Sequence, residues 1–250
     1  MQILEWDSNF FGKKIARANV EKLTENSLHS LLSESIKSEV DCLYLLLNAA
    51  DKSKVKLAEM NGFHLVDIRV TLARSIEPEL SPWVSPSSAI RLAKADDIIN
   101  LRSIAAANHK DSRFYSDGNF PAELCDELYA TWIEKSCNGY ADAVLVADRG
   151  EGAIGYTSCH IRENGVGNIG LVGISDKCQG QGLGKLLLAE ALSWFAANGV
   201  KKVEVITQGK NIGAQRLYQK CSFMTAAMEL WFHKWLQSPP ENIQPATKPY

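Results

Sequence analysis

Glycines at alternate positions mark the stretch of this sequence that is best suited to chemistry. Gly180, Gly182 and Gly184 lie in the run QGQGLGK, between Gln179 and Lys185. Glycines let a backbone approach a ligand closely, and the free amides at the start of a following helix attract an anion. The spacing matches neither a Walker A loop nor a dinucleotide-binding G-x-G-x-x-G. The stretch therefore predicts an anion site of another kind, or else a turn that only starts a helix.

A second polar stretch, NIGAQRLY, runs from Asn211 to Tyr218. Asn211 is a candidate N-cap residue for a helix. Tyr218 follows it by about two helical turns, so both side chains project from nearly the same face. A tyrosine on a helix is ordinarily a packing residue, and that alternative applies when this motif is taken alone.

Taken together, the two stretches resemble the signatures of the GNAT acetyltransferases. In that family Q-x-x-G-x-G holds the pyrophosphate of acetyl-coenzyme A (acetyl-CoA), and the tyrosine of N-x-x-A-x-x-L-Y protonates the departing sulfur. The resemblance implies Tyr218 as the catalytic acid, acetyl-CoA as co-substrate and no metal. The second pattern usually ends in Gly-Phe, whereas this chain has Ser222-Phe223. The residues expected to bind acetyl-CoA are Leu171, Val172, Gly173, Ile174, Gln179, Gly180, Gln181, Gly182, Leu183, Gly184, Lys185 and Asn211.

The apolar run Ile169–Ile174 precedes the glycine-rich loop and predicts a buried strand. In the GNAT family this strand pairs with the pantetheine arm, and one of its amides faces the thioester oxygen; we expect that amide to be Leu171 or Val172. Gly170 and Gly173 would let the backbone bulge toward the ligand, or would merely relieve crowding. His160 and Glu204 are candidates for a general base by strand position only, and a structural role is the expectation for each.

At finer grain the chain resembles one branch of the family, the dTDP-fucosamine acetyltransferases. The resemblance lies in residues 4–12, in Ser112-Arg113-Phe114 with Trp132-Ile133-Glu134, and in Thr207-Gln208. It implies acetylation of the 4-amine of a dTDP-4-amino-4,6-dideoxy sugar for surface polysaccharide such as lipopolysaccharide O-antigen. We expect Arg113 to hold a nucleotide phosphate, Phe114 to contact the base or sugar, and Gln208 to bond a sugar hydroxyl. Arg113 as a solvated side chain remains an alternative.

Two alternative functions would use part of the same chemistry. The same fold could acetylate a protein N-terminus or a small amine such as a polyamine, although Arg113 argues mildly against a cationic acceptor. A non-catalytic acyl-CoA-binding module would not need Tyr218. No Cys-His motif favours an acyl-enzyme, so we expect direct attack of the amine in a ternary complex.

The order of expected elements from residue 89 onward is β-α-α-β-β-β-α-β-α-β, an α/β order that is also the order of the GNAT fold. We therefore expect a mixed central sheet flanked by helices over 89–236, with a serine- and proline-rich linker over 76–88 and a disordered tail over 237–250. Residues 6–12 are expected as a turn, and residues 108–121 as an irregular segment.

The first part of the chain, residues 1–75, contains an echo of the catalytic part. Leu43, Asp51 and Phe63 fall on Val203, Asn211 and Phe223 at one constant offset in residue number, without a gap. We expect a truncated, degenerate GNAT-like domain that lacks the glycine-rich loop and has Ala58 in place of Tyr218. The alternative is that any two β-α-β units resemble each other to this degree.

Composition limits the partners. The net charge of −2 gives no support to nucleic acid or an anionic membrane as a partner, and no apolar run approaches the length of a membrane helix. The N-terminus does not have the pattern of a signal peptide. The six scattered cysteines are expected as reduced thiols of a cytoplasmic protein. The expected partner is a small nucleotide sugar, and a homodimer stays open.

Overall fold

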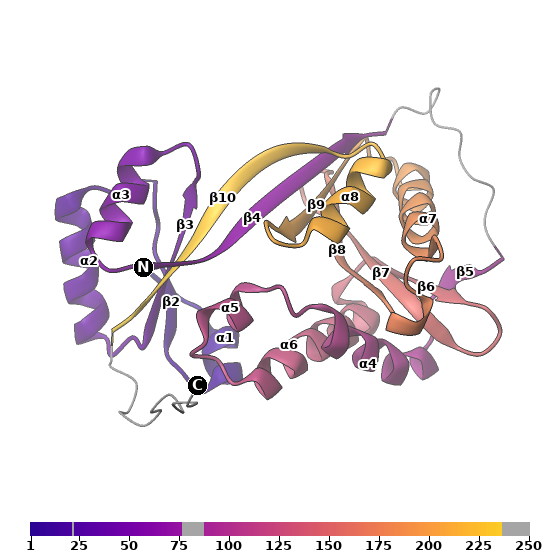
Figure 1. Ribbon diagram of the computed structural model, residues 1–250, viewed down its shortest axis with the longest axis horizontal. Coiled ribbons are helices and arrows are strands. Elements are labelled where there is room, and N and C mark those ends of the chain that lie inside the picture. The colour runs from indigo at the N-terminus through magenta and orange to yellow at the C-terminus, as the bar shows by residue number, and fades with distance from the viewer. Residues whose placement is uncertain (22, 77–87, 237–250) are drawn as a thin grey trace, which may run out of the picture. The chain divides into compact units, whose positions relative to one another are not determined.

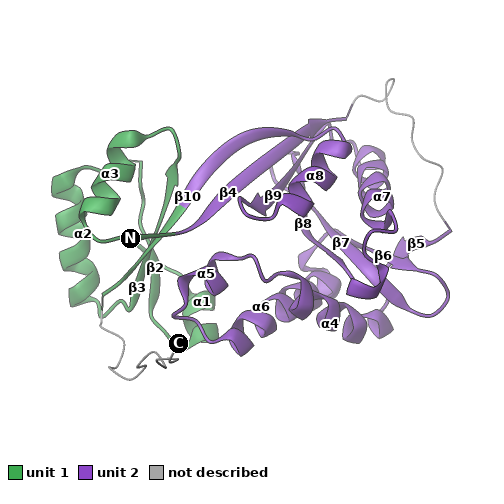
Figure 2. Cartoon of the chain, in the orientation of Figure 1, with its two compact units in different colours: residues 1–65, 231–250 green, residues 66–230 purple. Residues whose placement is uncertain are grey.

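A computed structural model describes residues 1–21, 23–76 and 88–236 of the chain as an α/β protein (Figure 1). The chain divides into two compact units (Figure 2), of which unit 1 contains residues 1–65 and 231–250 and unit 2 contains residues 66–230. Residues 77–87 of the expected linker and the expected tail over 237–250 lie outside the described residues. None of the described helices has the length and apolar character needed to cross a membrane.

From residue 89 onward, unit 2 has the expected helices and strands in the expected order, with short single turns added at Ala95–Asp97, Ser136–Tyr140 and Asp176–Cys178. A further addition is the short helix α5, inside the segment expected to be irregular. The Ser112 carbonyl accepts hydrogen bonds from the amides of Tyr115 and Ser116, which close this single turn. The elements of unit 2 are most of β4 (His64–Ser75), β5 (Ile90–Leu92), α4 (Ile98–Asn108), α5 (Arg113–Asp117), α6 (Ala122–Lys135), β6 (Ala143–Asp148), β7 (Ala153–Ile161), β8 (Gly167–Ile174), α7 (Leu183–Ala197), β9 (Lys202–Gln208), α8 (Ile212–Lys220) and the start of β10 (Met224–Trp235).

The strands of unit 2 form a mixed sheet in the order β10-β4-β9-β8-β7-β6-β5. Strands β8 and β9 are parallel, whereas β4 with β9 and β7 with β8 are antiparallel. A mixed sheet flanked by helices is the architecture expected from the sequence, and the structure confirms it (Figure 1).

The two faces of this sheet serve different purposes. Val203 and Val205 of β9 and Val70 and Leu72 of β4 are buried in the core that also contains the inner face of α7. Because side chains alternate along a strand, the neighbouring residues of these strands project from the opposite face. Tyr156 of β7 marks that second face, since its hydroxyl lies 3.1 Å from Nε2 of His109, the residue after α4. We call it the α4 face.

Unit 1 is smaller, with the strand order β1-β2-β3-β10. The prediction of a turn over residues 6–12 is wrong, because Glu5–Phe11 form helix α1. The helix is stabilised by stacking of Trp6 on Phe10 at 5.0 Å and ends at Gly12, whose left-handed conformation (φ 61°) lets its amide donate to Ser8. The other elements are β1 (Gln2–Ile3), β2 (Ile15–Arg17), α2 (Glu25–Lys37), β3 (Cys42–Asn48), α3 (Lys52–Met60) and the end of β10.

The echo in the sequence is also present in the structure. β3, α3 and β4 begin and end at the same constant offset before β9, α8 and β10, respectively. Asp51 and Asn211 cap their helices in nearly the same backbone conformation, with φ/ψ of −83°/77° and −80°/71°. Asp51 accepts from the Lys54 amide at 3.1 Å, and Asn211 accepts from the Ala214 amide at 2.9 Å.

The two helices also end in the same way. Gly62 and Ser222 have left-handed φ values of 70° and 62°. The next amide folds back in both copies, from Phe63 to the Ala58 carbonyl at 3.1 Å and from Phe223 to the Tyr218 carbonyl at 3.0 Å. Ser222 therefore forms the turn for which the family pattern usually has glycine, at the steric cost of a side chain with positive φ.

The two repeats are β3-α3-β4 and β9-α8-β10. The last strand of each, β4 or β10, pairs in the unit that contains the other repeat. In unit 2, β4 lies antiparallel to β9, and Arg74 Nη1 donates to the Cys221 carbonyl at 2.7 Å. In unit 1, the equivalent Lys234 Nζ donates to the Asn61 carbonyl at 2.8 Å. This exchange explains why the unit boundaries fall at residues 65 and 231, inside β4 and β10, and differ from the expected domain boundaries at 75 and 236.

Candidate active site

Strands β8 and β9 diverge at the place where a ligand is expected. They pair only from Gly167 to Ile169 against Val203 to Val205. On its other side β8 bulges, since Thr157 pairs with Val172 whereas Cys159 pairs with Ile169. Gly170 lies in this bulge, and a Cβ atom there would be 2.7 Å from both His160 Nε2 and Ser158 Oγ. Only glycine fits this position without a shift of those side chains.

The amides of β8 differ in what they bind. The Leu171 amide donates to Ser158 Oγ at 2.9 Å, and the Ile174 amide donates to Asn108 Oδ1 at 2.9 Å. The Ser175 amide donates to the carbonyl of Ile154, near the start of β7. Because amides alternate in direction along an antiparallel strand, the Val172 amide points away from β7, to the side from which β9 has diverged. Of the two amides expected from the sequence, Leu171 is already bonded and Val172 faces the gap.

Ser158 and His160 of β7 hold the bulge. Ser158 is buried and lies 3.3 Å from His160 Nε2 through its hydroxyl. Burial lowers the pKa of His160, so the imidazole is neutral near pH 7. With the hydrogen on Nδ1, Nε2 accepts from the Ser158 hydroxyl, which in turn accepts from the Leu171 amide. His160, a candidate base from the sequence, is thus engaged in supporting β8.

The glycine-rich loop contains a run of backbone amides without a hydrogen-bond partner among the described residues. Gly180 and Gly182 have φ values of 74° and 82°, and α7 begins directly after them. Within the described part of the chain, the amides of residues 180–184 have no hydrogen-bond acceptor. Gln179 stabilises the loop through its side chain, whose Nε2 donates to Asp176 Oδ1 at 2.9 Å. Five consecutive amides without an acceptor at the positive end of a long helix are suited to binding an anion, and the anion site that the spacing of the glycines predicts stays a prediction.

Helix α8 approaches the start of α7 closely. A Cβ atom on Gly184 would lie 2.9 Å from Leu217 Cδ2. The side-chain oxygen of Asn211 accepts the hydrogen bond that caps α8, which leaves its side-chain nitrogen available to a ligand. Tyr218 is 5% exposed, and burial raises the pKa of its hydroxyl. The phenol therefore stays protonated at neutral pH and is suited to donating a proton.

Two of the expected substrate residues lie on the α4 face or beside it. Gln208 is half-buried at the end of β9. Because side chains alternate along the strand, it projects from the α4 face. Arg113 begins α5, with its guanidinium carbon 4.2 Å from the centre of the Phe114 ring. Phe114 itself is 1% exposed and packs edge-on against Phe120 and Trp132, so its ring belongs to the core. The structure therefore gives no support to the expected contact between this ring and the base or sugar.

Glu204, the other candidate base, is paired. Its oxygens lie 2.7 Å from Arg162 Nη1 and 2.7 Å from Lys202 Nζ. These hydrogen-bonded cations lower the pKa of the carboxyl, which stays ionised and satisfied. A structural role therefore accounts for Glu204.

The side chains that accept hydrogen bonds from the β8 amides were not predicted from the sequence. Asn108 ends α4, 66 residues before Ile174, and no local pattern signals that contact. Ser158 could have been noticed as a polar residue in an apolar strand, but its partner depends on the bulge opposite.

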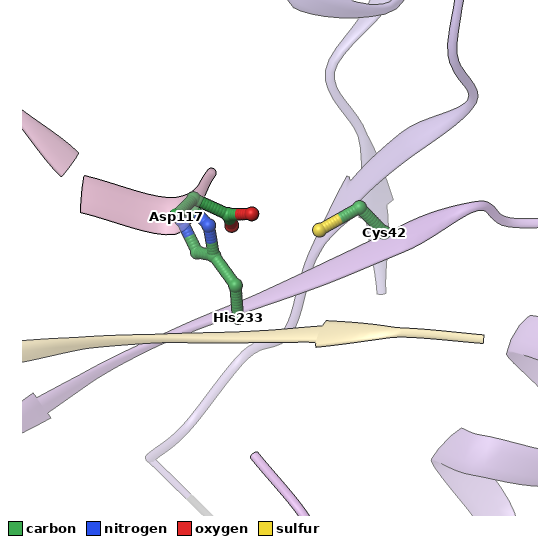
Figure 3. A group of neighbouring side chains, drawn as sticks. All are labelled: Cys42, Asp117 and His233. Carbon is green, nitrogen blue, oxygen red and sulfur yellow. The ribbon is translucent and has the colours of Figure 1, made fainter. Parts of the chain in front are cut away.

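A cluster of metal ligands does not occur within either unit, as far as the described residues show. Cys42 and His233 come from the neighbouring strands β3 and β10 of unit 1 (Figure 3), and both are buried. Asp117, also drawn there, belongs to α5 of unit 2.

Comparisons with known proteins agree with this geometry. The model of the acetyltransferase (GNAT) family matches residues 98–223. The chain is 28% identical to dTDP-fucosamine acetyltransferase of Escherichia coli over 92% of this chain and 96% of that protein. It is 22% identical to the spore coat polysaccharide biosynthesis protein SpsD of Bacillus subtilis, over 92% of this chain and 81% of that one.

The fold is shared with a crystal structure of a GCN5-related N-acetyltransferase from Sphaerobacter thermophilus. The TM-score is 0.62 at 17% identity, over 88% of this chain and 70% of that one. The family match covers about half of the chain and contains the bulged strand β8, the amide-rich loop and Tyr218. The protein is therefore a member of the GNAT family of acetyl-CoA-dependent N-acetyltransferases.

Proposed function

We propose that unit 2 binds acetyl-CoA and transfers its acetyl group to the amine of a nucleotide-linked amino-deoxy sugar, a step in surface-polysaccharide synthesis. The observation that carries the acetyl-CoA site is the row of five unbonded amides over residues 180–184, which suits a pyrophosphate. The sugar acceptor is supported by the similarity to dTDP-fucosamine acetyltransferase over nearly the whole of both chains. Acetyl-CoA and nucleotide sugars are cytoplasmic metabolites, so we place the reaction in the cytoplasm.

The residues of unit 2 have separate tasks in this reaction. The amides after Gln179 hold the pyrophosphate, and the gap between β8 and β9 receives the pantetheine arm, beside Asn211. The Val172 amide, directed into this gap, donates to the thioester oxygen and stabilises the negative charge that develops there during attack. An amine that approaches from the α4 face then reaches the carbonyl carbon. Tyr218 donates its proton to the sulfur as the carbon–sulfur bond breaks.

The acceptor would lie along the α4 face. Gln208 offers an amide to a sugar hydroxyl, and Arg113 offers charge to a phosphate. Phe114 has no part in this proposal, because its ring is buried. No step passes through a covalent acyl-enzyme, since the amine and the thioester meet directly.

Release of free CoA thiol from acetyl-CoA, with a panel of acceptors, tests this function. The panel contains dTDP- and UDP-linked 4-amino and 3-amino sugars, an N-terminal peptide and spermidine. We expect selective turnover of one dTDP-linked 4-amino sugar. Turnover of peptide or spermidine alone would keep the chemistry and replace the substrate. Binding of acetyl-CoA without turnover of any acceptor would indicate a non-catalytic module.

A further inference from the structure

A carboxylate that no sequence motif singles out lies on the α4 face, next to the end of β9. Arg69 of β4 pairs with Gln208 of β9, so Asp67, two residues earlier, projects from the same face as Gln208. The strand is fixed at this point, because the Gly209 amide donates to the Ile68 carbonyl. Asp67 is thus held beside the turn that leads to Asn211 and α8.

The groups around Asp67 carry both signs of charge. Lys210, in the turn after β9, and Arg113, on α5, bring positive charge to it, and Asp111 brings negative charge. The charge of Asp67 also acts on the buried hydroxyl of Tyr129 on α6. Lys210 Nζ is itself positioned by Ser116 Oγ at 2.8 Å.

These neighbours leave the Asp67 carboxylate available to a ligand. The carboxylate accepts from the Ile68 amide at 2.8 Å and forms no ion pair with a described residue. It is half-buried. Burial raises its pKa from 3.8 to about 6, against the opposing effects of the Ile68 amide, Lys210 and Arg113. A carboxylate of this kind is ionised at neutral pH and yet close to the proton affinity that suits a general base.

We propose that Asp67 binds the ammonium group of the acceptor and removes its proton, while Lys210 and Arg113 attract the phosphates of the same molecule. This rests on the proposed function and adds to it a reason for the acceptor class. A subsite with a carboxylate and two cations suits a ligand that carries both an amine and phosphates. A polyamine or a peptide N-terminus would leave Lys210 and Arg113 unmatched.

The proton balance closes with the groups present. Asp67 takes one proton from the ammonium, which frees the nitrogen lone pair. The nitrogen–carbon bond forms, the carbon–sulfur bond breaks, and the Tyr218 proton goes to the sulfur. The acetylated nitrogen then loses a second proton, which restores Tyr218 through solvent, and Asp67 returns its own proton to solvent. One ammonium and one thioester become one amide, one thiol and one released proton.

Asp67→Asn tests the proposal, with Asp111→Asn as a matched control. Both changes remove one negative charge from the same region at constant shape. For whichever acceptor the wild type uses, kcat/KM is measured from pH 5 to 9 at saturating acetyl-CoA, and acetyl-CoA affinity is measured by calorimetry. The wild-type profile should rise through about pH 6. Asp67→Asn should lose that limb and about 100-fold in kcat/KM, with unchanged acetyl-CoA affinity. Asp111→Asn should keep the limb and stay within about threefold of the wild type.

A second measurement does not depend on the substrate. The Asp67 carboxyl carbon is titrated by NMR in the ligand-free enzyme, with Asp67→Asn to assign the signal. A midpoint near 6 supports the proposal, whereas an ordinary midpoint near about 4 overturns it. So does an Asp67→Asn variant that keeps its activity and its acid limb. If the wild type acetylates only peptide or spermidine, the nucleotide-sugar proposal fails, and the Asp67 titration and pH profile still decide the role of Asp67 separately.

Discussion

The cost of keeping Asp67 ionised should be measurable in the stability of the protein. Its pKa is raised from 3.8 to about 6 on folding, because the half-buried carboxylate loses hydration. The folded state therefore holds this proton more tightly than the unfolded chain does. Below the unfolded pKa both states are protonated and the carboxyl costs nothing. Stability then falls as the pH rises from about 4 to about 6, and the full cost is present above that.

The size of the effect follows from the shift. About two pKa units correspond to about 3 kcal/mol at about 1.4 kcal/mol per unit. Because Asp67 is only half-buried, solvent screening reduces this to about 1–2 kcal/mol. Asp67→Asn removes the charge and keeps an oxygen that can accept from the Ile68 amide. The variant should therefore be more stable than the wild type by about 1–2 kcal/mol at about pH 7.5, and nearly equal to it at about pH 4.

Urea unfolding of the wild type and Asp67→Asn at these two pH values measures the difference. In thermal unfolding the same gain corresponds to roughly 2–8 °C in Tm for a chain of this size. Asp111→Asn serves as the control for a general change in net charge. A variant that is less stable than the wild type at the higher pH, or a difference that does not change with pH, would refute the physical reasoning for Asp67. A gain in stability together with a loss of turnover would mark a site that trades stability for chemistry.

Four further predictions concern unit 2 and the exchanged strands. Tyr218→Phe should lower kcat by about 100-fold with acetyl-CoA affinity unchanged in calorimetry, and unchanged kcat would remove Tyr218 from the mechanism. Ser158→Ala leaves the Leu171 amide without its acceptor, so it should cost about 1–3 kcal/mol in urea unfolding and lower kcat; full stability and activity would show that the bulge does not need Ser158. Gly173→Ala places a Cβ atom 2.6 Å from the buried Tyr156 ring, so it should cost about 1–3 kcal/mol, which wild-type urea stability would contradict. A chain that ends at Leu230 removes the part of β10 that belongs to unit 1, so hydrogen exchange should show lost protection in β3 and retained protection in β7; equal protection of β3 in both chains would argue against the exchange.

Features that depend on neighbours in sequence were predictable from the sequence. The loop from Gln179 to Lys185, the cap at Asn211 and the constant offset between the two β-α-β segments all follow from local spacing. Their hydrogen bonds join residues only a few positions apart, so the residue types themselves contain the information. Helix α1 is an exception, because two stacked aromatic rings and Gly12 made a helix where a turn was expected.

The tertiary structure decided which distant groups meet. The repeat in the sequence did not reveal that β4 pairs with β9, because a strand carries the same alternation whichever partner it has. Packing also buried Phe114, brought Asn108 and Ser158 to the amides of β8, and left Asp67 half-buried beside Lys210 and Arg113. A side chain's burial, its hydrogen-bond partners and its pKa are set by segments far away in the chain. The sequence by itself therefore identifies the family and predicts the loop for acetyl-CoA, whereas the acceptor subsite that we propose could be inferred only from the folded protein.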